Sequence, residues 1–123
     1  MENRTIGIMH YWCGCPEVAN SKWQSFLHVV RACASRGWRN YMVWTRLPED
    51  PGLWRPFAEA GCEIILQRRP SRNFDFRCVY DTYRLLRTLR CHIFHCHNVH
   101  TSPLIGAALA PVRVLSKLSM PCF

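Results

Sequence analysis

The sequence contains few lysines and few acidic residues, and it lacks a long apolar run. Only Lys22 and Lys117 are lysines among 16 basic residues, while aspartate and glutamate together number 8. The longest apolar stretch, from Leu104 to Val112, is much shorter than the roughly 20 residues that span a bilayer. The first residues also lack the layout of a signal peptide. These absences argue against a membrane-spanning or secreted protein, and we expect a cytoplasmic one.

The motifs of several enzyme classes are missing as well. The sequence contains no G-x-G-x-x-G or G-x-x-x-x-G-K loop for nucleotide phosphates and no G-x-S-x-G nucleophile turn. It has no C-x-x-C, and no pair of carboxylates falls at the predicted strand ends. Its positive charge favours nucleic-acid binding, but no recognisable module accompanies the charge. We therefore expect no serine hydrolase and no nucleic-acid partner.

What the sequence does have is a strong positive charge and many cysteines. The formal net charge is +8, carried mainly by arginines. The planar fork of donors in arginine suits phosphate and carboxylate groups. A basic face therefore indicates an anionic partner, such as a phosphorylated ligand or an acidic membrane surface, or else it is simply solvated. The 8 cysteines, several of them on apolar faces, are expected to be reduced core residues.

Short apolar runs alternate with amphipathic segments along all 123 residues. The predicted strands cover 4–11, 41–45, 63–66, 92–97 and 112–116, and the predicted helices between them cover 20–37, 50–61, 73–90 and 102–110. This alternation predicts an α/β fold with a Rossmann-like, doubly wound parallel sheet in three layers, α/β/α. The length suits a single domain. Ligands of such sheets bind outside the carboxyl ends of the strands.

The third predicted helix is amphipathic. Its apolar residues recur at helical spacing and are expected to face the sheet: Phe76, Val79, Tyr80, Tyr83, Leu86 and Leu89. Four arginines fall largely off this stripe: Arg77, Arg84, Arg87 and Arg90. They either lie along an acidic membrane surface or are solvated.

The strongest candidate site is the end of the fourth predicted strand and the helix start after it. His95 and His97 share one face of the strand, because side chains alternate, and Cys96 points to the other. His97, at the strand tip, is the favoured functional residue. His95 either takes part in function or packs between sheet and helix. The following helix start, with the hydroxyls of Thr101 and Ser102, suits an anion.

A metal site in the same segment is the weaker interpretation. His95, Cys96, His97 and His100 are crowded together, but strand spacing plus a loop histidine provides at most three ligands, and no carboxylate lies nearby. We therefore assign no metal.

The loop after the first strand is the second candidate. Gly14 lies at this strand-to-helix turn, and Asn20, Ser21 and Lys22 open the helix and can hold an anionic group. In the alternative interpretation, Asn20 or Ser21 is only a helix cap and Lys22 is solvated.

The segment Ile93-Phe94-His95-Cys96-His97-Asn98-Val99-His100 resembles the "D-hydrophobic-hydrophobic-H-x-H" strand and loop of retaining glycosyltransferases of the GT-B fold, family 4 (group 1). Ile6-Gly7-Ile8-Met9-His10 and the helix after it are similar to the start of that family. The similarity covers the whole chain, as the N-terminal, acceptor-side domain of the GT-B fold. Two departures stand out: Cys13-Gly14-Cys15 occupies the usual Gly-Gly position, and Cys91-His92 the usual aspartate position.

The resemblance implies sugar transfer from a nucleotide-sugar donor to a sugar or lipid-linked acceptor, with retention of configuration. It places His97 at the donor sugar and Gly14 beside the donor phosphates. We extend the substrate-binding set to Asn20, Lys22, Asn98, His100, Thr101 and Ser102. No tightly bound cofactor is implied.

We expect residues 1–123 to form one such domain without the donor-binding C-terminal domain, and to be inactive alone. We also expect self-association through the face that meets the second domain, and a peripheral position at the inner face of a membrane. The alternative is a non-catalytic binding module for an anionic or lipid-linked sugar acceptor.

Overall fold

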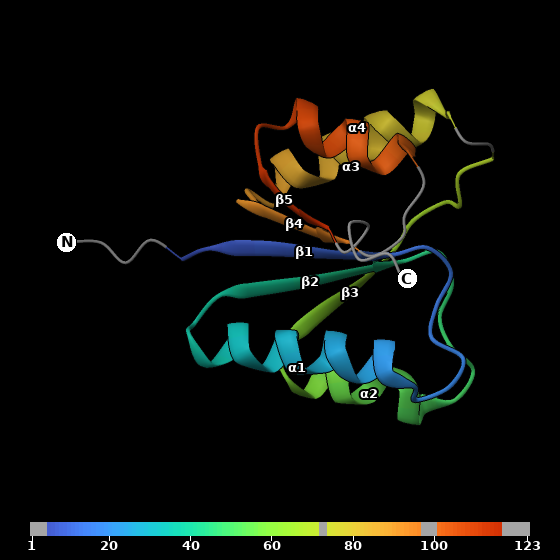
Figure 1. Ribbon diagram of the computed structural model, residues 1–123, viewed down its shortest axis with the longest axis vertical. Coiled ribbons are helices and arrows are strands. Elements are labelled where there is room, and N and C mark those ends of the chain that lie inside the picture. The colour runs from blue at the N-terminus through green and yellow to red at the C-terminus, as the bar shows by residue number, and fades with distance from the viewer. Residues whose placement is uncertain (1–4, 72–73, 97–100, 117–123) are drawn as a thin grey trace.

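The computed structural model describes residues 5–71, 74–96 and 101–116 and forms one parallel sheet between two helical layers. The strands lie in the order β3-β2-β1-β4-β5. Helices α1 and α2 cover one face, and α3 and α4 cover the other (Figure 1). The elements are β1 (Gly7–Trp12), α1 (Ser21–Ser35), β2 (Arg39–Trp44), α2 (Pro51–Glu59), β3 (Cys62–Leu66), α3 (Phe76–Thr88), β4 (Ile93–Cys96), α4 (Thr101–Leu109) and β5 (Arg113–Ser116). The predicted three-layer, doubly wound fold is confirmed.

Side-chain caps fix where three helices begin. The Asn20 side chain accepts a hydrogen bond from the backbone N–H of Trp23 at 3.0 Å, and Asp50 accepts from Gly52 at 2.9 Å. Asp75 accepts from the second and third residues of α3 at 3.0 and 3.3 Å. These bonds satisfy amide groups that have no partner inside the helix. Of Asn20 and Ser21, the structure therefore selects Asn20 as the cap of α1, and it shows Asp75 as the cap of α3.

Each face of the sheet has its own apolar core. Toward α1 and α2, the core is built around Phe26, Trp44 and Phe57. Toward α3 and α4, it is built around Tyr11 and Phe94. All six residues of β1 are buried because this central strand is covered on both faces. The seven described cysteines are free thiols and all but Cys13 are buried, as expected for core residues.

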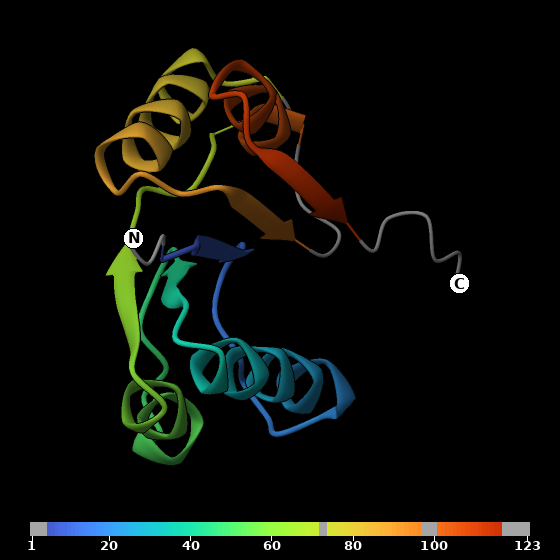
Figure 2. The same ribbon diagram turned by 90° about the vertical axis from the view of Figure 1, so that its left-hand side faces the viewer.

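Helix α3 is rotated relative to the sequence prediction. Phe76 and Tyr80 were expected in the core, but their side chains are 76% and 57% exposed. The buried residues of α3 are Cys78, Val79, Thr82 and Leu86. The rotation follows from the partner of α3, since the helix packs against α4 as well as the sheet (Figure 2). Close contact with α4 turns the smaller side chains of α3 inward and leaves the two aromatic side chains in water.

In the part of the chain that the structure describes, no helix is both long and apolar enough to cross a bilayer.

Candidate functional site

The strand order places a topological switch point at the carboxyl ends of β1 and β4, which is where the ligand crevice of an open α/β sheet lies. The chain runs from β1 outward to β2 in one direction, and β4 lies on the other side of β1. In open α/β sheets, ligands bind at this point, where loops from neighbouring strands leave in opposite directions. The loop after β1 and the segment between β4 and α4 therefore flank one site. These are the two candidate segments that the sequence selected.

Two buried histidines form the floor of this site. The register of β1 and β4 pairs His10 with His95, and their Nδ1 atoms lie 3.0 Å apart. On its other side, His10 Nε2 lies 2.9 Å from Oδ1 of Asn40 in β2. The Asn40 amide nitrogen in turn donates to the backbone carbonyl of Val30 in α1 at 3.3 Å. A chain of hydrogen bonds thus crosses three strands beneath the crevice.

The direction of this chain determines where the protons lie. Because the Asn40 nitrogen donates to a carbonyl, its Oδ1 must be the acceptor for His10 Nε2–H. Burial lowers the pKa of His10 to about 4, against the opposing effect of the Asn40 hydrogen bond, so His10 is neutral near pH 7. A neutral ring with a proton on Nε2 has a bare Nδ1. His95 Nδ1–H is therefore the donor between the two rings. The tautomer of His95 thus follows from the orientation of the Asn40 amide, which the Val30 carbonyl fixes.

The two rings are sealed from the α1 side by Phe26. Its ring centroid lies 4.9 Å from that of His95 and 6.2 Å from that of His10. His95 is buried and lies between sheet and helix, as the packing interpretation expected. Sequence patterns did not single out His10 or Asn40. The available signal was a histidine inside an apolar strand, because a buried imidazole needs a hydrogen-bond partner.

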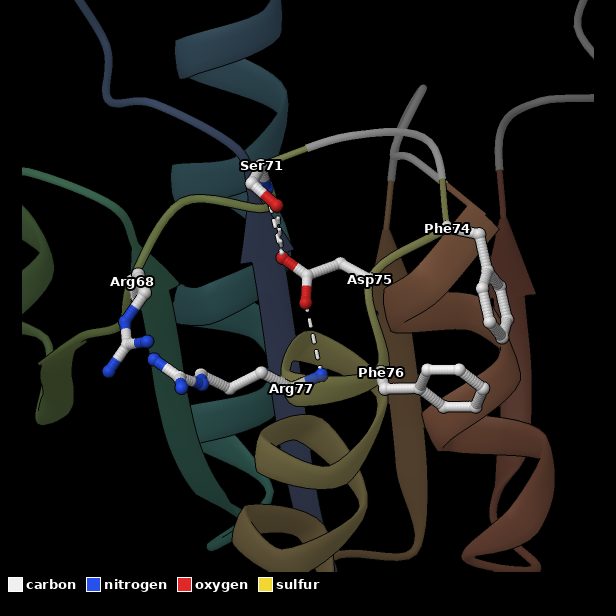
Figure 3. Close-up of a pocket in the computed structure, with 6 residues that line it drawn as sticks. All are labelled: Arg68, Ser71, Phe74, Asp75, Phe76 and Arg77. Atoms are coloured by element: carbon white, nitrogen blue, oxygen red, sulfur yellow. Dashed lines mark hydrogen bonds between the residues drawn. The ribbon is translucent and has the colours of Figure 1, made fainter.

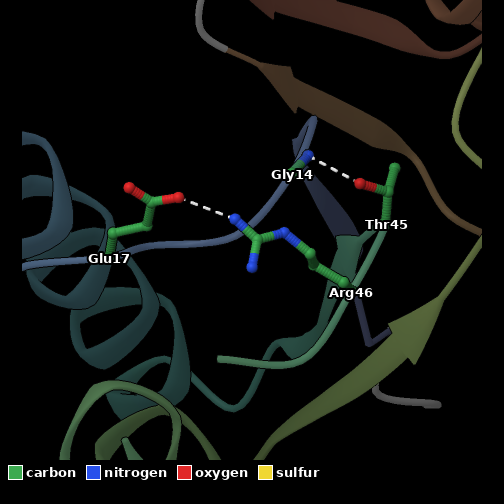
Figure 4. Close-up of polar contacts among 4 residues, drawn as sticks. All are labelled: Gly14, Glu17, Thr45 and Arg46. Carbon is green, nitrogen blue, oxygen red and sulfur yellow. Dashed lines mark hydrogen bonds and ion pairs between the residues drawn. The ribbon is translucent and has the colours of Figure 1, made fainter. Parts of the chain in front are cut away.

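The loop after β1 is tied to the end of β2. The backbone N–H of Gly14 donates to Thr45 Oγ1 at 2.8 Å, and the Gly14 carbonyl accepts from the Thr45 N–H at 2.9 Å. Nearby, Arg46 and Glu17 form an ion pair at 2.6 Å (Figure 4). This pair is solvent-exposed and contributes about 1 kcal/mol at most. The loop is therefore held mainly by the two backbone contacts of Gly14.

These contacts change how Gly14 can take part in binding. Its N–H is already bonded within the fold, so the group that usually approaches a phosphate is in use. Its φ of +94° is a conformation that favours glycine. A Cβ added there would meet no atom within 4 Å, so the space beside the residue is open. Gly14 can admit a ligand by its small size, and its assignment as a binding residue stays a prediction.

Positive charge gathers at the carboxyl end of β1. Lys22, in the first turn of α1, places its Nζ 4.4 Å from the centroid of the Trp12 ring. Partial burial lowers the pKa of Lys22. Burial raises the pKa of the Cys13 thiol, while the charges of Arg69 and Lys22 oppose that effect. The mouth of the site is thus positive, which favours an anionic ligand.

The remaining predicted site residues have different environments. Asn20 caps α1, as described above. Ser102 is fully buried, and its Oγ accepts a hydrogen bond from the backbone N–H of Asp75 at 2.7 Å, which ties α4 to the start of α3. Thr101 is exposed at the first residue of α4. The other members of the set lie outside the described residues: His97, Asn98 and His100.

A pocket of about 570 Å³ lies beside the start of α3, between the β3–α3 loop and the helix. It is lined by Arg68, Ser71, Phe74, Asp75, Phe76 and Arg77 (Figure 3). The Asp75 carboxylate bonds to the Ser71 N–H at 2.9 Å and to its hydroxyl at 3.1 Å, so it fixes the loop. The two arginine side chains extend together on one side, away from the two phenylalanine rings (Figure 3).

No group of three or more histidine, cysteine, aspartate or glutamate side chains within residues 5–71, 74–96 and 101–116 is arranged to hold a metal ion. Two histidines of the candidate segment, His97 and His100, lie outside those ranges.

One solved structure relates this fold to a known class of enzyme. A glycosyltransferase from Rickettsia africae ESF-5 superposes with a TM-score of 0.71 at 10% sequence identity. The chain folds like part of a glycosyltransferase. The superposition covers 93% of this chain and 30% of the Rickettsia protein, so this chain spans less than a third of that enzyme's length. No protein-family model matches the sequence, and neither does any curated protein.

Proposed function

We propose that the chain is the N-terminal, acceptor-side domain of a retaining glycosyltransferase of the GT-B fold, family 4, which uses a nucleotide-sugar donor. The observation that carries this proposal is the switch point between β1 and β4, in a fold similar to that of a glycosyltransferase. The H-x-H pattern of His95 and His97 belongs to the same edge of the sheet. Its first histidine occupies the floor of the crevice.

In this proposal, His97 contacts the donor sugar from the end of β4. Asn98, His100 and Thr101 line the same side, and Ser102 supports it through its bond to the α3 cap. On the opposite side, Gly14 leaves room for the ligand, with Asn20 at the start of α1. The Lys22 ammonium group attracts the anionic part of the substrate.

The substrates we propose are a nucleotide sugar and a sugar or lipid-linked acceptor, with no tightly bound cofactor. The donor is held between two domains, so the chain is inactive alone and gains activity with a donor-binding second domain. The length of the similar glycosyltransferase is consistent with this arrangement, because the chain corresponds to 30% of it. We place the reaction in the cytoplasm, at the inner face of a membrane.

The proposal can be tested by supplying the missing half of the cleft. The DNA downstream of the Phe123 codon is expected to encode a second α/β domain. Transfer from a panel of nucleotide hexoses should be absent with the chain alone and appear when both domains are present. His97→Ala should lower the rate roughly 100-fold, as loss of one positioned donor does in other enzymes.

His28→Ala provides the matched control, since His28 is exposed on α1 away from the crevice. That variant should transfer sugar at the rate of the unmodified chain. Robust transfer by the isolated chain would contradict the need for a second domain. An unchanged rate in His97→Ala would contradict the site assignment.

A non-catalytic binding module is the second candidate function. The observation that favours it is the pocket beside α3, where Arg68 and Arg77 lie on one side. Two neighbouring guanidinium groups suit a phosphate or carboxylate of a sugar acceptor. In this case, inorganic pyrophosphate should bind to the chain alone, and the double variant R68Q/R77Q should abolish binding while His97→Ala leaves it unchanged.

A further inference from the structure

The outer surface of α3 exposes large aromatic side chains to water, which is unfavourable for apolar groups. Phe76 is 76% exposed and Tyr80 is 57% exposed, while Phe74, just before the helix, is 43% exposed. The rings of Phe74 and Phe76 pack against each other with centroids 4.6 Å apart. Three large aromatic side chains in seven residues form an apolar patch of the kind that marks a docking surface. We call the stripe of Phe76, Tyr80, Arg84 and Arg87 the α3 outer face.

Arginines complete this face. Residues 68–90 contain seven arginines and two aspartates, a formal charge of +5 out of +8 for the whole chain. Arg77, Arg84 and Arg87 are exposed on the helix. The single ion pair between described side chains joins Arg46, just after β2, to Glu17 in the β1–α1 loop. Within the described residues, Arg77, Arg84 and Arg87 form no ion pair with a carboxylate, and the segment keeps an excess of positive charge.

The helical spacing places the aromatic and basic groups on one side. Residues 76, 80, 84 and 87 recur at intervals of four, four and three, which keeps them on one stripe of an α-helix. The 13-residue helix is about 20 Å long. It lies in the outer layer that α3 and α4 form, with the sheet below this layer in Figure 1. The stripe can thus contact a flat surface along its whole length.

We propose that the α3 outer face docks on an anionic lipid bilayer. Aromatic rings at one end of the stripe enter the boundary between headgroups and acyl chains, where Tyr and Phe gain from leaving water. Arginines along the rest of the stripe contact anionic headgroups. A soluble polyanion would satisfy the arginines alone and leave the rings in water. The combination of exposed rings and unneutralised charge is the reason for choosing a bilayer.

Vesicle co-sedimentation of the full chain tests this proposal. Vesicles of equal parts phosphatidylglycerol and phosphatidylcholine should bind the chain, whereas phosphatidylcholine alone should not. Each basic residue near an anionic surface strengthens binding by roughly fivefold, so R84Q/R87Q should weaken binding about 30-fold. R84K/R87K keeps both charges and should bind like the unmodified chain. R31Q/R36Q removes two exposed charges from α1 and its C-cap, on the opposite layer, and should have little effect.

The aromatic contribution is separated from the charge by salt. Raising the salt concentration screens the attraction of the arginines but not the burial of the rings. The unmodified chain should retain part of its binding at high salt, and F76S/Y80S should lose that part. Circular dichroism melting checks that each variant is folded.

Several outcomes would overturn the proposal. Either a failure to bind anionic vesicles or equally good binding to phosphatidylcholine vesicles contradicts the proposal. Equal losses of binding in R84Q/R87Q and R31Q/R36Q would contradict the role of α3. So would an F76S/Y80S variant that binds like the unmodified chain at every salt concentration. The last result would indicate simple polyanion binding. Vesicle binding needs neither a donor nor sugar transfer, so its failure would remove the placement of the reaction at a membrane and leave the proposed sugar transfer untouched. Failure of sugar transfer would likewise leave vesicle binding untouched.

Discussion

His10 is a polar side chain in a strand that is buried on both faces. An imidazole without partners in such a place costs the desolvation free energy of its two nitrogens. Asn40 and His95 supply both partners, at 2.9 and 3.0 Å. In the tautomers described above, a proton on Nδ1 of His10 would face the Nδ1–H of His95, so this arrangement favours the uncharged His10 ring. The hydrogen-bond chain therefore links the floor of the crevice to pH.

Acid is expected to destabilise the fold through His10. Its pKa is about 4 in the folded chain and 6.5 without burial, so the unfolded state takes up the proton first. Stability from this group is complete above about pH 6.5 and is lost as the pH falls toward 4. Between pH 6.5 and 5 the free energy of unfolding should drop by about 1.6 kcal/mol, with a slope that approaches about 1.4 kcal/mol per pH unit in the lower part of this range. Denaturant unfolding at several pH values measures this slope.

Two variants isolate the contribution of His10. His10→Gln keeps polar atoms near Asn40 and His95 but does not titrate, so its stability should be nearly constant over this pH window. His28→Gln removes a histidine from the exposed surface of α1 and should keep the slope of the unmodified chain. A slope that persists in His10→Gln would show that another group causes it.

At the scale of elements, the contact between α3 and α4 depends on one glycine. A Cβ on Gly106 would lie 2.6 Å from the Val79 carbonyl oxygen and 2.9 Å from the Thr82 Cβ. Backbone atoms cannot move aside as a flexible side chain can. The absence of a side chain at Gly106 therefore lets the two helices approach closely. This approach also sets the rotation of α3 that exposes Phe76 and Tyr80.

Replacing Gly106 by alanine should destabilise the chain. The extra methyl group must push α4 away from α3, and overpacking of this kind costs about 1 to 3 kcal/mol. In an unpacked helix the same substitution would be favourable by about 1 kcal/mol, so the sign of the effect reports the contact. Thermal and denaturant unfolding measure it.

Gly52→Ala is the matched control. A Cβ at Gly52 would approach the flexible Asp50 side chain at 3.2 Å, in an exposed turn of α2. Its effect should be small. A Gly106→Ala variant as stable as the unmodified chain would mean that α3 and α4 are less closely packed than described.

At the scale of the whole molecule, the sheet has two outer strands with exposed apolar side chains. In β5, Val114 and Leu115 are 37% and 44% exposed, and Leu66 at the end of β3 is 54% exposed. Outer strands present unpaired backbone groups as well as side chains, and both favour association with another chain. The sheet edges are thus a second route to self-association, distinct from the face that was expected to meet a second domain, and self-association stays a prediction.

We expect the apparent mass of the chain to rise with concentration above the monomer value of 14.4 kDa. L66K/L115K adds a charge to both edges and should return the apparent mass toward that value. Val18→Lys changes an apolar residue that is 60% exposed in a loop, away from both edges, and should leave association unchanged. Light scattering after size exclusion measures the mass. An unmodified chain that stays monomeric at every concentration would contradict the predicted self-association.

The sequence by itself determined the order of strands and helices, and with it the fold class. Period-two and period-3.6 patterns, with caps such as Asn20 and Asp75, are local properties that can be read along the chain. The crossover rule for parallel strands then restricts the layers. The sequence also placed the candidate loops at one edge of the sheet. For His95, it left two interpretations, and one of them was packing between sheet and helix.

Only the tertiary structure decided which residues meet. The pairing of His10 with His95 and Asn40 depends on strand register, which joins residues 85 and 30 positions apart. The exposure of Phe76 and Tyr80 depends on how α3 rotates against α4, and the sequence of α3 alone does not contain Gly106. Local patterns fix an element and its more apolar side, whereas its final orientation follows from the shape of the neighbours that it packs against.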